Sequence, residues 1–570
     1  MQERWNDTMK VIIVGGVAGG ATAAARIRRL DEQADIVVFE RSGYISYANC
    51  GLPYYIGGII QDRSELTLQT PESFFSRFRV AMRVRHEVTA IHPDQKTVSV
   101  KNLETGEEFE ESYDKLLLSP GAKPTQPRLP GVGLDKLFTL RTVEDTFRIK
   151  EYINENHPRS AVLAGGGFIS LELAENLREL GMEVTIVQRP KQLMNPFDPD
   201  MAAFIHSEMR RHGVKLALGH TVEGFQEQGG GVDVLLKDEA PLHADMVVLA
   251  IGVSPDTGLA KEAGLELGVK GSIVVNDRME TSAPDIYAVG DAVQVKHFVT
   301  GQDVLLSLAG PANKQGRIAA DNICGGDSRY LGSQGSSVIK VFSMTAATTG
   351  VNETNARKAG LDVDTVILSP MSHAGYYPGG KVMTMKVVFE KGTYRLLGAQ
   401  IVGYEGVDKR IDVLATAIRA GMKATELKDL DLAYAPPYSS AKDPVNMAGF
   451  MIENIANGVL KQWHLADALP RDGSVTLLDT RTVGEYASGH IDGFLNIPVD
   501  ELRERLDELD KGKPVYVICQ SGLRSYIACR ILHGNGFECY NFSGGFRFYD
   551  AVMHDRCLIE SATACGMDKV

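Results

Sequence analysis

Residues 10–20 read KVIIVGGVAGG, an apolar run that passes directly into a glycine-rich turn. Residues 21–30, rich in Ala and Arg, predict a helix after the turn. Strand, glycine turn and helix form the arrangement that lets the backbone approach a pyrophosphate and places that group at the helix N-terminus. Val17 stands where the G-x-G-x-x-G pattern has its middle glycine, so the stretch is either a dinucleotide site or an ordinary glycine turn.

A second stretch repeats this pattern and favours the dinucleotide interpretation. Residues 160–164 predict an apolar strand, residues 165–170 read GGGFIS, and residues 171–180 predict a helix. Two such units in one chain imply two dinucleotides.

The strand predicted after each unit ends in a different side chain. The first ends at Glu40, which is placed to accept a hydrogen bond from a ribose hydroxyl. The second ends at Gln188, so the carboxylate that would repel a 2′-phosphate is missing. Arg189 or Lys191 either pairs with that phosphate or is a solvated loop residue. NADH and NADPH therefore both remain open.

A single cysteine, Cys50, lies in the segment SYANCGLP at residues 46–53, where a helix is predicted to begin. Free N–H groups and the positive end of the helix dipole favour a thiolate, which would make Cys50 a nucleophile at neutral pH. Burial would instead raise its pKa and leave it inert, as for many isolated cysteines. The dinucleotide segments on both sides favour the nucleophile.

The length, composition and charge of the chain limit the classes of protein to which it can belong. A chain of 570 residues predicts roughly three to five domains. A hydrophobic content of 44% with 58 glycines is typical of a turn-rich α/β protein. The formal net charge of -13 argues against nucleic-acid binding, which relies on clustered Lys and Arg. We also expect no membrane association and no signal peptide, because no apolar run approaches about 18 residues and residues 1–8 are polar.

The seven cysteines are irregularly spaced and form no CxxC pair. Neither a disulfide framework nor a metal site is therefore predicted, and free thiols fit a reducing cytoplasm. Five cysteines away from the recognisable motifs are interpreted as structural or incidental: Cys324, Cys529, Cys539, Cys557 and Cys565.

The segment TSAPDIYAVGD at residues 281–291 resembles the second flavin motif of the two-dinucleotide flavoprotein disulfide reductases. Residues 113–122 and 245–255 resemble the paired crossover segments of that family. Together with the two glycine turns, these signals follow the family's order. The resemblance implies FAD at the first turn and NAD(P)H at the second.

The resemblance also implies which residues hold these cofactors. It assigns FAD binding to Gly15, Gly16, Val17, Ala18, Gly19, Glu40, Arg41, Gly121, Gly290 and Asp291, with Asp291 on the ribityl chain. It assigns the second dinucleotide to Gly165, Gly167, Phe168, Ile169, Gln188, Arg189 and Gly252.

Better-known members of the family carry a CxxxxC disulfide, but Ser46 stands four residues before Cys50 and Tyr55 five after it. The sequence SYANCG is instead similar to the coenzyme A disulfide reductase branch, whose cysteine forms a mixed disulfide with coenzyme A. Arg26 and Arg29, three apart on the first helix, either face a phosphate together or are solvated. The resemblance further assigns CoA or substrate binding to Ser46, Asn49, Asn313 and Arg317.

Residues 337–458 predict an α+β segment with strands at 386–389 and 397–403 and a helix at 408–420. The segment resembles the dimerisation domain of the family. We therefore expect a homodimer.

Two tyrosine clusters stand out in this segment, YYPGG at residues 376–380 and AYAPPY at residues 433–438. In the CoA disulfide reductases, tyrosines from these places reach the active cysteine of the partner subunit. The resemblance thus implies that Tyr434 and one of Tyr376 or Tyr377 supply a proton. Packing is the alternative role.

Residues 459–473 are predicted to be a linker before a separate domain. In that domain, DTR at residues 479–481 and CQSGLRS at residues 519–525 resemble the two signatures of rhodanese sulfurtransferases. A strand-to-helix loop of this kind aims N–H groups at an anion. We expect Cys519 to carry a persulfide at its base and Arg524 to close it.

The loop length separates sulfur transfer from related chemistries. Phosphate-binding relatives have one more residue between Cys and Arg, whereas four residues separate Cys519 from Arg524. Phosphatase or arsenate chemistry and an inactive structural domain are the alternatives. Gln520 replaces the arginine often found after the cysteine, which leaves the substrate preference open.

The predicted fold class is α/β with two Rossmann-like dinucleotide domains of the flavoprotein disulfide reductase type, an α+β dimerisation domain and a C-terminal α/β rhodanese domain. The predicted boundaries are 1–122 with 244–336 for FAD, 123–243 for NAD(P)H, 337–458 for dimerisation and 474–570 for the rhodanese domain.

As a whole, the chain resembles NAD(P)H-dependent persulfide or polysulfide reductases. The resemblance implies FAD, NAD(P)H and coenzyme A as cofactors, and electron transfer through Cys50 to CoA persulfide, polysulfide or CoA disulfide. Alternatives are an NADH oxidase or peroxidase, in which Cys50 cycles through a sulfenic acid, and a persulfide or redox sensor. The physiological acceptor, the preferred nicotinamide, the tightness of CoA binding and direct transfer from Cys519 to Cys50 stay open.

Overall fold

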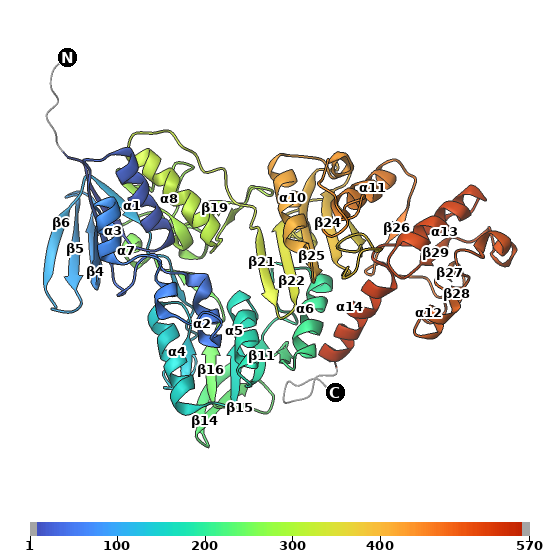
Figure 1. The fold of residues 1–570 in the computed structure, drawn as a ribbon, viewed down its shortest axis with the longest axis horizontal. Helices are drawn as coiled ribbons and strands as arrows, with labels where there is room; N and C mark the ends of the chain where they lie inside the picture. The colour runs from blue at the N-terminus through green and yellow to red at the C-terminus, as the bar shows by residue number, and fades with distance from the viewer. Residues whose placement is uncertain (1–7, 561–570) are drawn as a thin grey trace, which may run out of the picture. The chain divides into compact units, whose positions relative to one another are not determined.

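The computed structural model describes residues 8–560, which Figure 1 shows as a ribbon with its elements labelled. The chain divides into two compact units. Unit 1 contains Met1–Arg189 and His220–Gly335, and unit 2 contains Pro190–Gly219 and Ser336–Val570. Cys565, which we expected to be incidental, lies outside the described residues.

A five-stranded parallel sheet in unit 1 confirms the first predicted strand. Its order is β18-β7-β1-β2-β3, with all neighbours parallel. Both faces of β1 are covered, so its apolar run is continuous rather than alternating. The strands are β1 (Lys10–Val14), β2 (Asp35–Glu40), β3 (Ala81–Val84), β7 (Lys115–Leu118) and β18 (Ile286–Ala288).

Helices α1 (Ala18–Leu30) and α8 (Ala309–Ile323) cross at a glycine contact. A Cβ added at Gly316 would lie 2.4 Å from the carbonyl oxygen of Gly19, so the backbones touch directly. Helix α1 begins three residues before the predicted start, because the glycine turn already has helical geometry at Ala18.

The second glycine unit forms a parallel sheet that includes β11, β10, β16 and β9 in that order. Its predicted strands and helix are confirmed. The elements are β9 (Leu137–Thr139), β10 (Ser160–Ala164), β11 (Glu183–Gln188), β16 (Met246–Leu249) and helix α5 (Phe168–Glu179).

The other elements of unit 1 are short helices and antiparallel strands around these sheets. The helices are α2 (Leu52–Gly57), α3 (Pro71–Phe78), α4 (Val143–Asn156) and α7 (Gly258–Glu262). The strands are β4 (His86–His92), β5 (Thr97–Asn102), β6 (Glu108–Ser112), β8 (Ala122–Pro124), β13 (Val222–Gln228), β14 (Gly231–Leu236), β15 (Leu242–Ala244), β17 (Val253–Pro255), β19 (Val295–Lys296) and β20 (Asp303–Val304).

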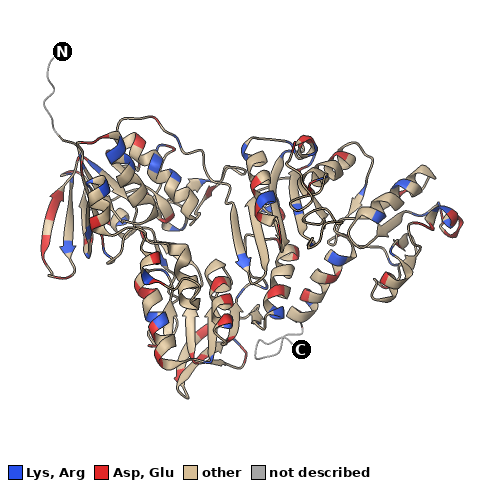
Figure 2. Cartoon of the chain, viewed as in Figure 1, with Lys and Arg blue, Asp and Glu red and all other residues tan. Residues whose placement is uncertain are grey.

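Figure 2 shows acidic residues along β6, while basic and acidic residues are interspersed on the helices. No helix within residues 8–560 combines the length and apolarity that a membrane span needs. The cysteines in this range are all free thiols. Cys529 and Cys539 are buried in one core, Cys324 is half-buried and Cys557 is exposed.

Unit 2 contains an antiparallel sheet with the order β21-β22-β25-β24-β23. The predicted strands and helix of this segment are confirmed. The elements are β21 (Ser337–Val341), β22 (Met344–Gly350), β23 (Val363–Leu368), β24 (Thr384–Glu390), β25 (Leu396–Gly403) and helices α9 (Glu353–Lys358), α10 (Val407–Arg419) and α11 (Pro444–Ala456).

Residues 190–219, predicted to belong to the NAD(P)H-binding domain, pack in unit 2. They contain α6 (Pro199–Arg211) and β12 (Lys215–Leu218). The buried Lys386 ammonium lies 3.2 Å from Asp198, 2.7 Å from Asp200 and 2.8 Å from Glu353. Burial opposes the charge of Lys386, but the three carboxylates outweigh it and raise the pKa of the lysine. This cluster ties α6 to the antiparallel sheet.

A five-stranded parallel sheet near the C-terminus has the order β26-β30-β29-β27-β28. Its strands are β26 (Gln462–Trp463), β27 (Thr476–Asp479), β28 (Leu495–Asn496), β29 (Val515–Ile518) and β30 (Cys539–Phe542). Its helices are α12 (Val483–Ala487), α13 (Leu523–Gly534) and α14 (Gly545–Glu560).

The predicted linker over residues 459–473 is wrong at Gln462 and Trp463, which form the edge strand β26 of this sheet. The Trp463 ring is buried and packs on Phe542 with 4.2 Å between ring centroids. A tryptophan anchored in the core removes the freedom of a linker at this point.

The C-terminal domain is also fixed to the rest of unit 2 by polar contacts. His464 Nε2 lies 3.0 Å from Asp364, and the His206 ring lies 2.8 Å from Asp555. Arg210 lies 2.6 Å from the same Asp555 carboxylate. Figure 1 shows the resulting neighbourhood of α14 and α6.

Candidate active sites

The helices that follow the two glycine turns begin without a side-chain cap. Neither Val17 before α1 nor Gly167 before α5 makes a capping hydrogen bond. By contrast, α4 of the same unit has a complete capping box from Thr142 and Asp145. The first N–H groups of α1 and α5 are therefore left for an anion, as a bound pyrophosphate requires.

Both turns also need glycine for close backbone approach. Gly15 has a φ of +98°, and a Cβ there would lie 2.1 Å from the Ser119 carbonyl oxygen. Gly165 has a φ of +117°, and a Cβ there would lie 2.2 Å from the Ala250 carbonyl oxygen. These features fit two dinucleotides, one at each turn.

Glu40 lies at the end of β2, beside the first turn. The N–H groups of Gly16 and Ser42 each donate to its carboxylate at 2.8 Å. Burial raises the pKa of Glu40 even though these hydrogen bonds oppose the shift. The neighbouring Arg41 is paired with Asp256 at 2.7 Å. Glu40, which accepts from Gly16 N–H, is the carboxylate at this turn.

At the second turn, β11 ends without a carboxylate: Gln188 is half-buried and Arg189 is exposed. Phe168 and Ile169, the first residues of α5, are half-buried. Gly252 lies in the crossover region, where its carbonyl accepts from Thr125 N–H at 2.9 Å. The two predicted crossover segments do pair, as the antiparallel strands β8 and β17.

Cys50 lies in a short 3-10 turn, Asn49–Gly51, directly before α2. The expected helix start is thus present, and of the two pKa shifts that the sequence left open the structure favours the upward one. The residue is exposed, yet neighbouring atoms desolvate the thiol and raise its pKa, and the Glu172 carboxylate raises it further. The Arg141 guanidinium acts in the opposite direction.

Arg141, which the sequence analysis missed, connects three segments around Cys50. It donates to Asp291 of the flavin motif at 2.6 Å and to the Ala122 carbonyl at 3.2 Å. With the Asn49 amide oriented to satisfy both partners, its Nδ2 donates to the Arg141 carbonyl at 3.1 Å and its Oδ1 accepts from the guanidinium at 3.3 Å. No local pattern marks this arginine, because its partners are distant in sequence.

Glu172, also missed, lies on α5 within electrostatic reach of Cys50 and Tyr54. Burial, reinforced by Glu175, raises the pKa of Glu172 to about 7. Burial and these carboxylates raise the pKa of Tyr54 to about 12. Glu172 can therefore gain or lose a proton near neutral pH beside the cysteine.

The predicted CoA-binding residues lie on α1, α8 and the Cys50 loop. Arg26 is paired with Asp321 of α8 at 2.7 Å, which corrects the expectation that it is free for a phosphate, whereas Arg29 is exposed. Asn313 accepts from Thr22 at 2.6 Å, and Arg317 is exposed. Ser46 has a φ of 44° and donates its N–H to the Gly16 carbonyl, which places the loop against the first turn.

In unit 2, the two tyrosine clusters meet. The hydroxyls of Tyr376 and Tyr434 are 2.6 Å apart, and both side chains are exposed. The hydrogen bond from Tyr376 raises the pKa of Tyr434, so this phenol stays protonated at neutral pH. Tyr377 is exposed and contacts the edge of His373 instead.

A buried arginine, Arg410, holds both tyrosine loops. Its guanidinium donates to the Ser372 carbonyl at 2.9 Å and to Ser439 Oγ at 3.1 Å. Asp443 balances its charge at 2.9 Å. The first loop also donates to the second directly, from Ala374 N–H to the Ser439 carbonyl at 2.9 Å.

Cys519 lies at the end of β29 and is fully buried. Gly522 N–H and Ser525 Oγ–H both donate to its sulfur at 3.1 Å. The Cys519 carbonyl accepts from Phe546 N–H at 2.7 Å, and the Gln520 carbonyl accepts from Arg547 N–H at 3.1 Å. The loop is thus fixed with its donors aimed at the sulfur, where they can bind the negative charge of a thiolate or persulfide.

Arg524, which we predicted to close this loop, pairs with Glu485 of α12. Its two terminal nitrogens each lie 2.7 Å from a carboxylate oxygen of Glu485. The arginine lowers the pKa of Glu485 to about 2. The charge expected to bind the sulfur substrate is therefore already matched by a carboxylate.

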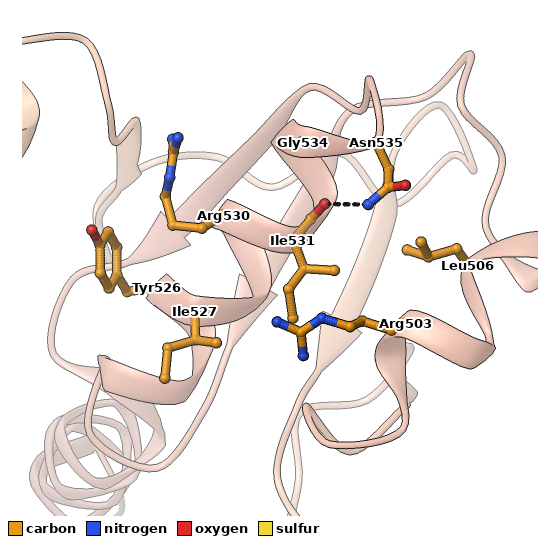
Figure 3. Close-up of a pocket in the computed structure, with 8 residues that line it drawn as sticks. All are labelled: Arg503, Leu506, Tyr526, Ile527, Arg530, Ile531, Gly534 and Asn535. Atoms are coloured by element: carbon orange, nitrogen blue, oxygen red, sulfur yellow. Dashed lines mark hydrogen bonds between the residues drawn. The ribbon is translucent and has the colours of Figure 1, made fainter.

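A cavity of about 490 Å³ lies on the same domain, between α13 and Arg503. Figure 3 shows the residues that line it. Its lining includes Tyr526, Ile527 and Ile531 but no residue of the segment 519–525. The cavity therefore lies outside the Cys519 loop.

Three family models match the chain in sequence. Residues 9–316 match the pyridine nucleotide-disulphide oxidoreductase family, and residues 336–444 match the dimerisation domain of the same family. Residues 463–551 match the rhodanese-like domain. This last match begins at Trp463, in agreement with the edge strand β26.

Similar proteins are known by sequence and by structure. Coenzyme A disulfide reductase of Staphylococcus aureus is 37% identical over 77% of this chain and 99% of its own length. The structure of reduced Bacillus anthracis CoADR-RHD has a TM-score of 0.94 at 48% identity, covering 97% of this chain and 100% of its own. The NAD-dependent persulfide reductase of A. fulgidus has a TM-score of 0.89 at 38% identity, covering 95% and 100%.

The opposing effects of Glu172 and Arg141 on Cys50 are testable through thiol alkylation. Glu172→Gln removes a negative charge, so it should lower the pKa of Cys50 and speed its alkylation at pH 8 by about three- to tenfold, and Arg141→Met should slow it. Iodoacetamide labelling of the Cys50 peptide, followed by mass spectrometry across pH, measures both rates. Cys557, an exposed cysteine outside the site, is the internal control. Equal Cys50 rates in wild type and both variants would contradict the assignment.

Proposed function

The chain belongs to the pyridine nucleotide-disulphide oxidoreductase family and carries a C-terminal rhodanese domain, and we propose that it reduces CoA persulfide, polysulfide or CoA disulfide with electrons from NAD(P)H. Hydrosulfide or thiol is the product. The family implies FAD and NAD(P)H as cofactors. The free thiols of the described residues fit the cytoplasmic location that we propose.

The observation that carries this proposal is one unpaired cysteine at the flavin motif and a second in a sulfur-transfer loop. Cys50 is a free thiol with no cysteine at CxxxxC spacing, so its disulfide partner comes from the substrate. Cys519 is held by donors that suit a persulfide. A reductase for disulfides alone has no need of the second cysteine.

FAD, held at the first glycine turn, would take a hydride from NAD(P)H and supply two electrons. The Cys50 thiolate attacks the inner sulfur of CoA persulfide, forms a Cys50–CoA disulfide and releases hydrosulfide. The two electrons then break that disulfide and return the thiolate and CoA. Asn49, fixed by Arg141, and Ser46 orient the incoming sulfur.

The proton for the leaving group comes, in this proposal, from the tyrosine pair of the other subunit in a homodimer. Tyr434 is protonated at neutral pH, like any phenol, and its hydrogen bond with Tyr376 raises its pKa further; both phenols are exposed. The two hydrogen-bonded phenols are exposed on a domain that matches the dimerisation family. This exposure supports a role for them in the active site of the partner subunit.

The proposed role of Cys50 as the nucleophile predicts that its substitution stops sulfide release but not flavin reduction. Cys50→Ser should abolish sulfide release from CoA persulfide, at least about a hundredfold, while the flavin absorbance still bleaches with NAD(P)H, because the nucleophile is lost and the dinucleotide turns are intact. Cys557→Ser is the matched control and should behave as wild type. Normal sulfide release by Cys50→Ser would refute the mechanism. Loss of peroxide or oxygen reduction, with persulfide turnover retained, would instead favour the oxidase alternative.

The dimeric site predicts complementation. Tyr434→Phe should slow acceptor reduction by about ten- to a hundredfold, the size of a lost general acid, without slowing flavin bleaching. Tyr438→Phe, in the same loop, is the control. Mixed dimers of Tyr434→Phe with Cys50→Ser should regain activity, because both lesions fall in one composite site. No recovery after verified subunit exchange would show that each chain builds its own site.

A sulfur relay from Cys519 to Cys50 needs a carrier. Tethering supplies an effective concentration in the millimolar range only if the tether lets two sites meet. Here the contacts of His464 with Asp364 and of Asp555 with His206 tie the rhodanese domain to the rest of unit 2. We therefore propose that CoA, loaded with sulfur at Cys519, diffuses to Cys50.

The relay makes its own prediction. Cys519→Ala should lose sulfurtransferase activity and lower sulfide production from polysulfide by about tenfold or more, because loading at Cys519 is a nucleophilic step. Reduction of CoA disulfide should stay near wild type, since it bypasses Cys519. Steady-state assays with limiting CoA separate these reactions. Wild-type sulfide production from dilute polysulfide in Cys519→Ala would mean that the two domains act independently.

A further inference from the structure

Two arginines near the Cys519 loop, Arg524 and Arg481, are matched by carboxylates. Arg524 makes two 2.7 Å contacts with Glu485. Arg481, fully buried, lies 2.7 Å from Asp479 and packs its guanidinium on Phe546. The position after Cys519 holds the neutral Gln520. The charges of these two arginines are thus balanced.

Glu485 is held in place independently of Arg524. It is the third residue of α12, where it accepts from Thr482 N–H and Thr482 Oγ–H at 2.9 Å. Thr482 in turn accepts from Glu485 N–H, which completes a capping box. A capping box suits either glutamate or glutamine at this position. The carboxylate is therefore fixed by its own helix and available to pair with Arg524.

The substrates that can give a sulfur atom to Cys519 differ in the charge that they carry at the reacting atoms. Thiosulfate carries two negative charges on the group that donates its sulfur. A thiol persulfide carries at most one at its reacting sulfurs. An unpaired arginine strengthens the binding of a dianion more than that of a monoanion, and a nearby carboxylate weakens it more.

We propose that Glu485 sets the donor specificity of the Cys519 site, because it neutralises Arg524 and so favours thiol persulfides over the dianion thiosulfate. This inference rests on the proposed sulfur transfer at Cys519. Glu485 touches no substrate; it is a positioning residue that acts through Arg524.

The transfer step balances for both donors. With a persulfide, the Cys519 thiolate attacks the outer sulfur of R–S–SH; the S–S bond breaks, Cys519 becomes Cys519–S–SH, and RS⁻ leaves. With thiosulfate, the thiolate takes the outer sulfur and sulfite leaves as a dianion. The reaction with thiosulfate therefore brings more negative charge into the loop, and its leaving group carries more negative charge away.

Glu485→Gln tests the proposal, because it removes the charge and keeps the capping box. Thiocyanate formation from cyanide is measured with thiosulfate and with glutathione persulfide, after subtraction of the Cys519→Ala rate. We expect kcat/KM for thiosulfate to rise by about three- to tenfold, mainly through a lower KM, while the persulfide value changes by less than about twofold. The gain should shrink at high salt.

Two variants separate charge from structure. Glu485→Asp keeps the negative charge and should keep the low thiosulfate activity of the wild type. Glu501→Gln breaks another arginine contact of the same domain, the 2.9 Å pair with Arg505, and should leave both donors unchanged. Thermal unfolding of each variant shows whether the fold is retained.

The outcomes are distinguishable. Equal changes for both donors in Glu485→Gln, or no gain with thiosulfate, would overturn the specificity role while sulfur transfer stands. A wild-type rate equal to that of Cys519→Ala with both donors would refute the sulfurtransferase function itself.

Discussion

The geometry around Cys50 depends on one guanidinium that joins three segments of unit 1. Arg141 contacts the Asn49 amide, the Asp291 carboxylate and the Ala122 carbonyl. It is partly buried, and a charge in this position needs partners because desolvation is costly. The same contacts that satisfy the arginine place the cysteine loop against the flavin motif. A single cation thereby fixes the loop and partly offsets the rise in the Cys50 pKa.

In unit 2 the comparable constraint is the Asp555 carboxylate at the buried junction of α14 and α6. His206 Nε2 accepts from Leu193 N–H, so Nδ1 carries the proton and donates to Asp555 at 2.8 Å. Arg210 supplies the balancing charge. Together with the contact between His464 and Asp364, this network holds the rhodanese domain on the rest of unit 2. This attachment supports the proposed relay by a diffusing carrier rather than by a moving domain.

Local patterns were sufficient to predict the strands, the glycine turns and both cysteine loops, because their signals lie within a few residues. Contacts between distant segments were not predictable from one sequence. Arg141 meets Asp291 across 150 residues, and Arg524 meets Glu485 across 39, and no local signal marks either pair. The linker prediction failed for a related reason. Trp463 lies in a two-residue strand that exists only because β30 pairs with it.

Both sulfur sites place a carboxylate where a simple anion site would have only cations. Glu172 counteracts Arg141 at Cys50, and Glu485 neutralises Arg524 at Cys519. At Cys50 the carboxylate adds to desolvation in raising the pKa of the free thiol, and Arg141 opposes this shift. At Cys519 the carboxylate lowers the attraction for small dianions, and it leaves the hydrogen bonds to the sulfur unchanged. There the pair of Arg524 with Glu485 acts on the choice of ligand while Gly522 and Ser525 hold the sulfur, so selectivity and reactivity are set by different groups.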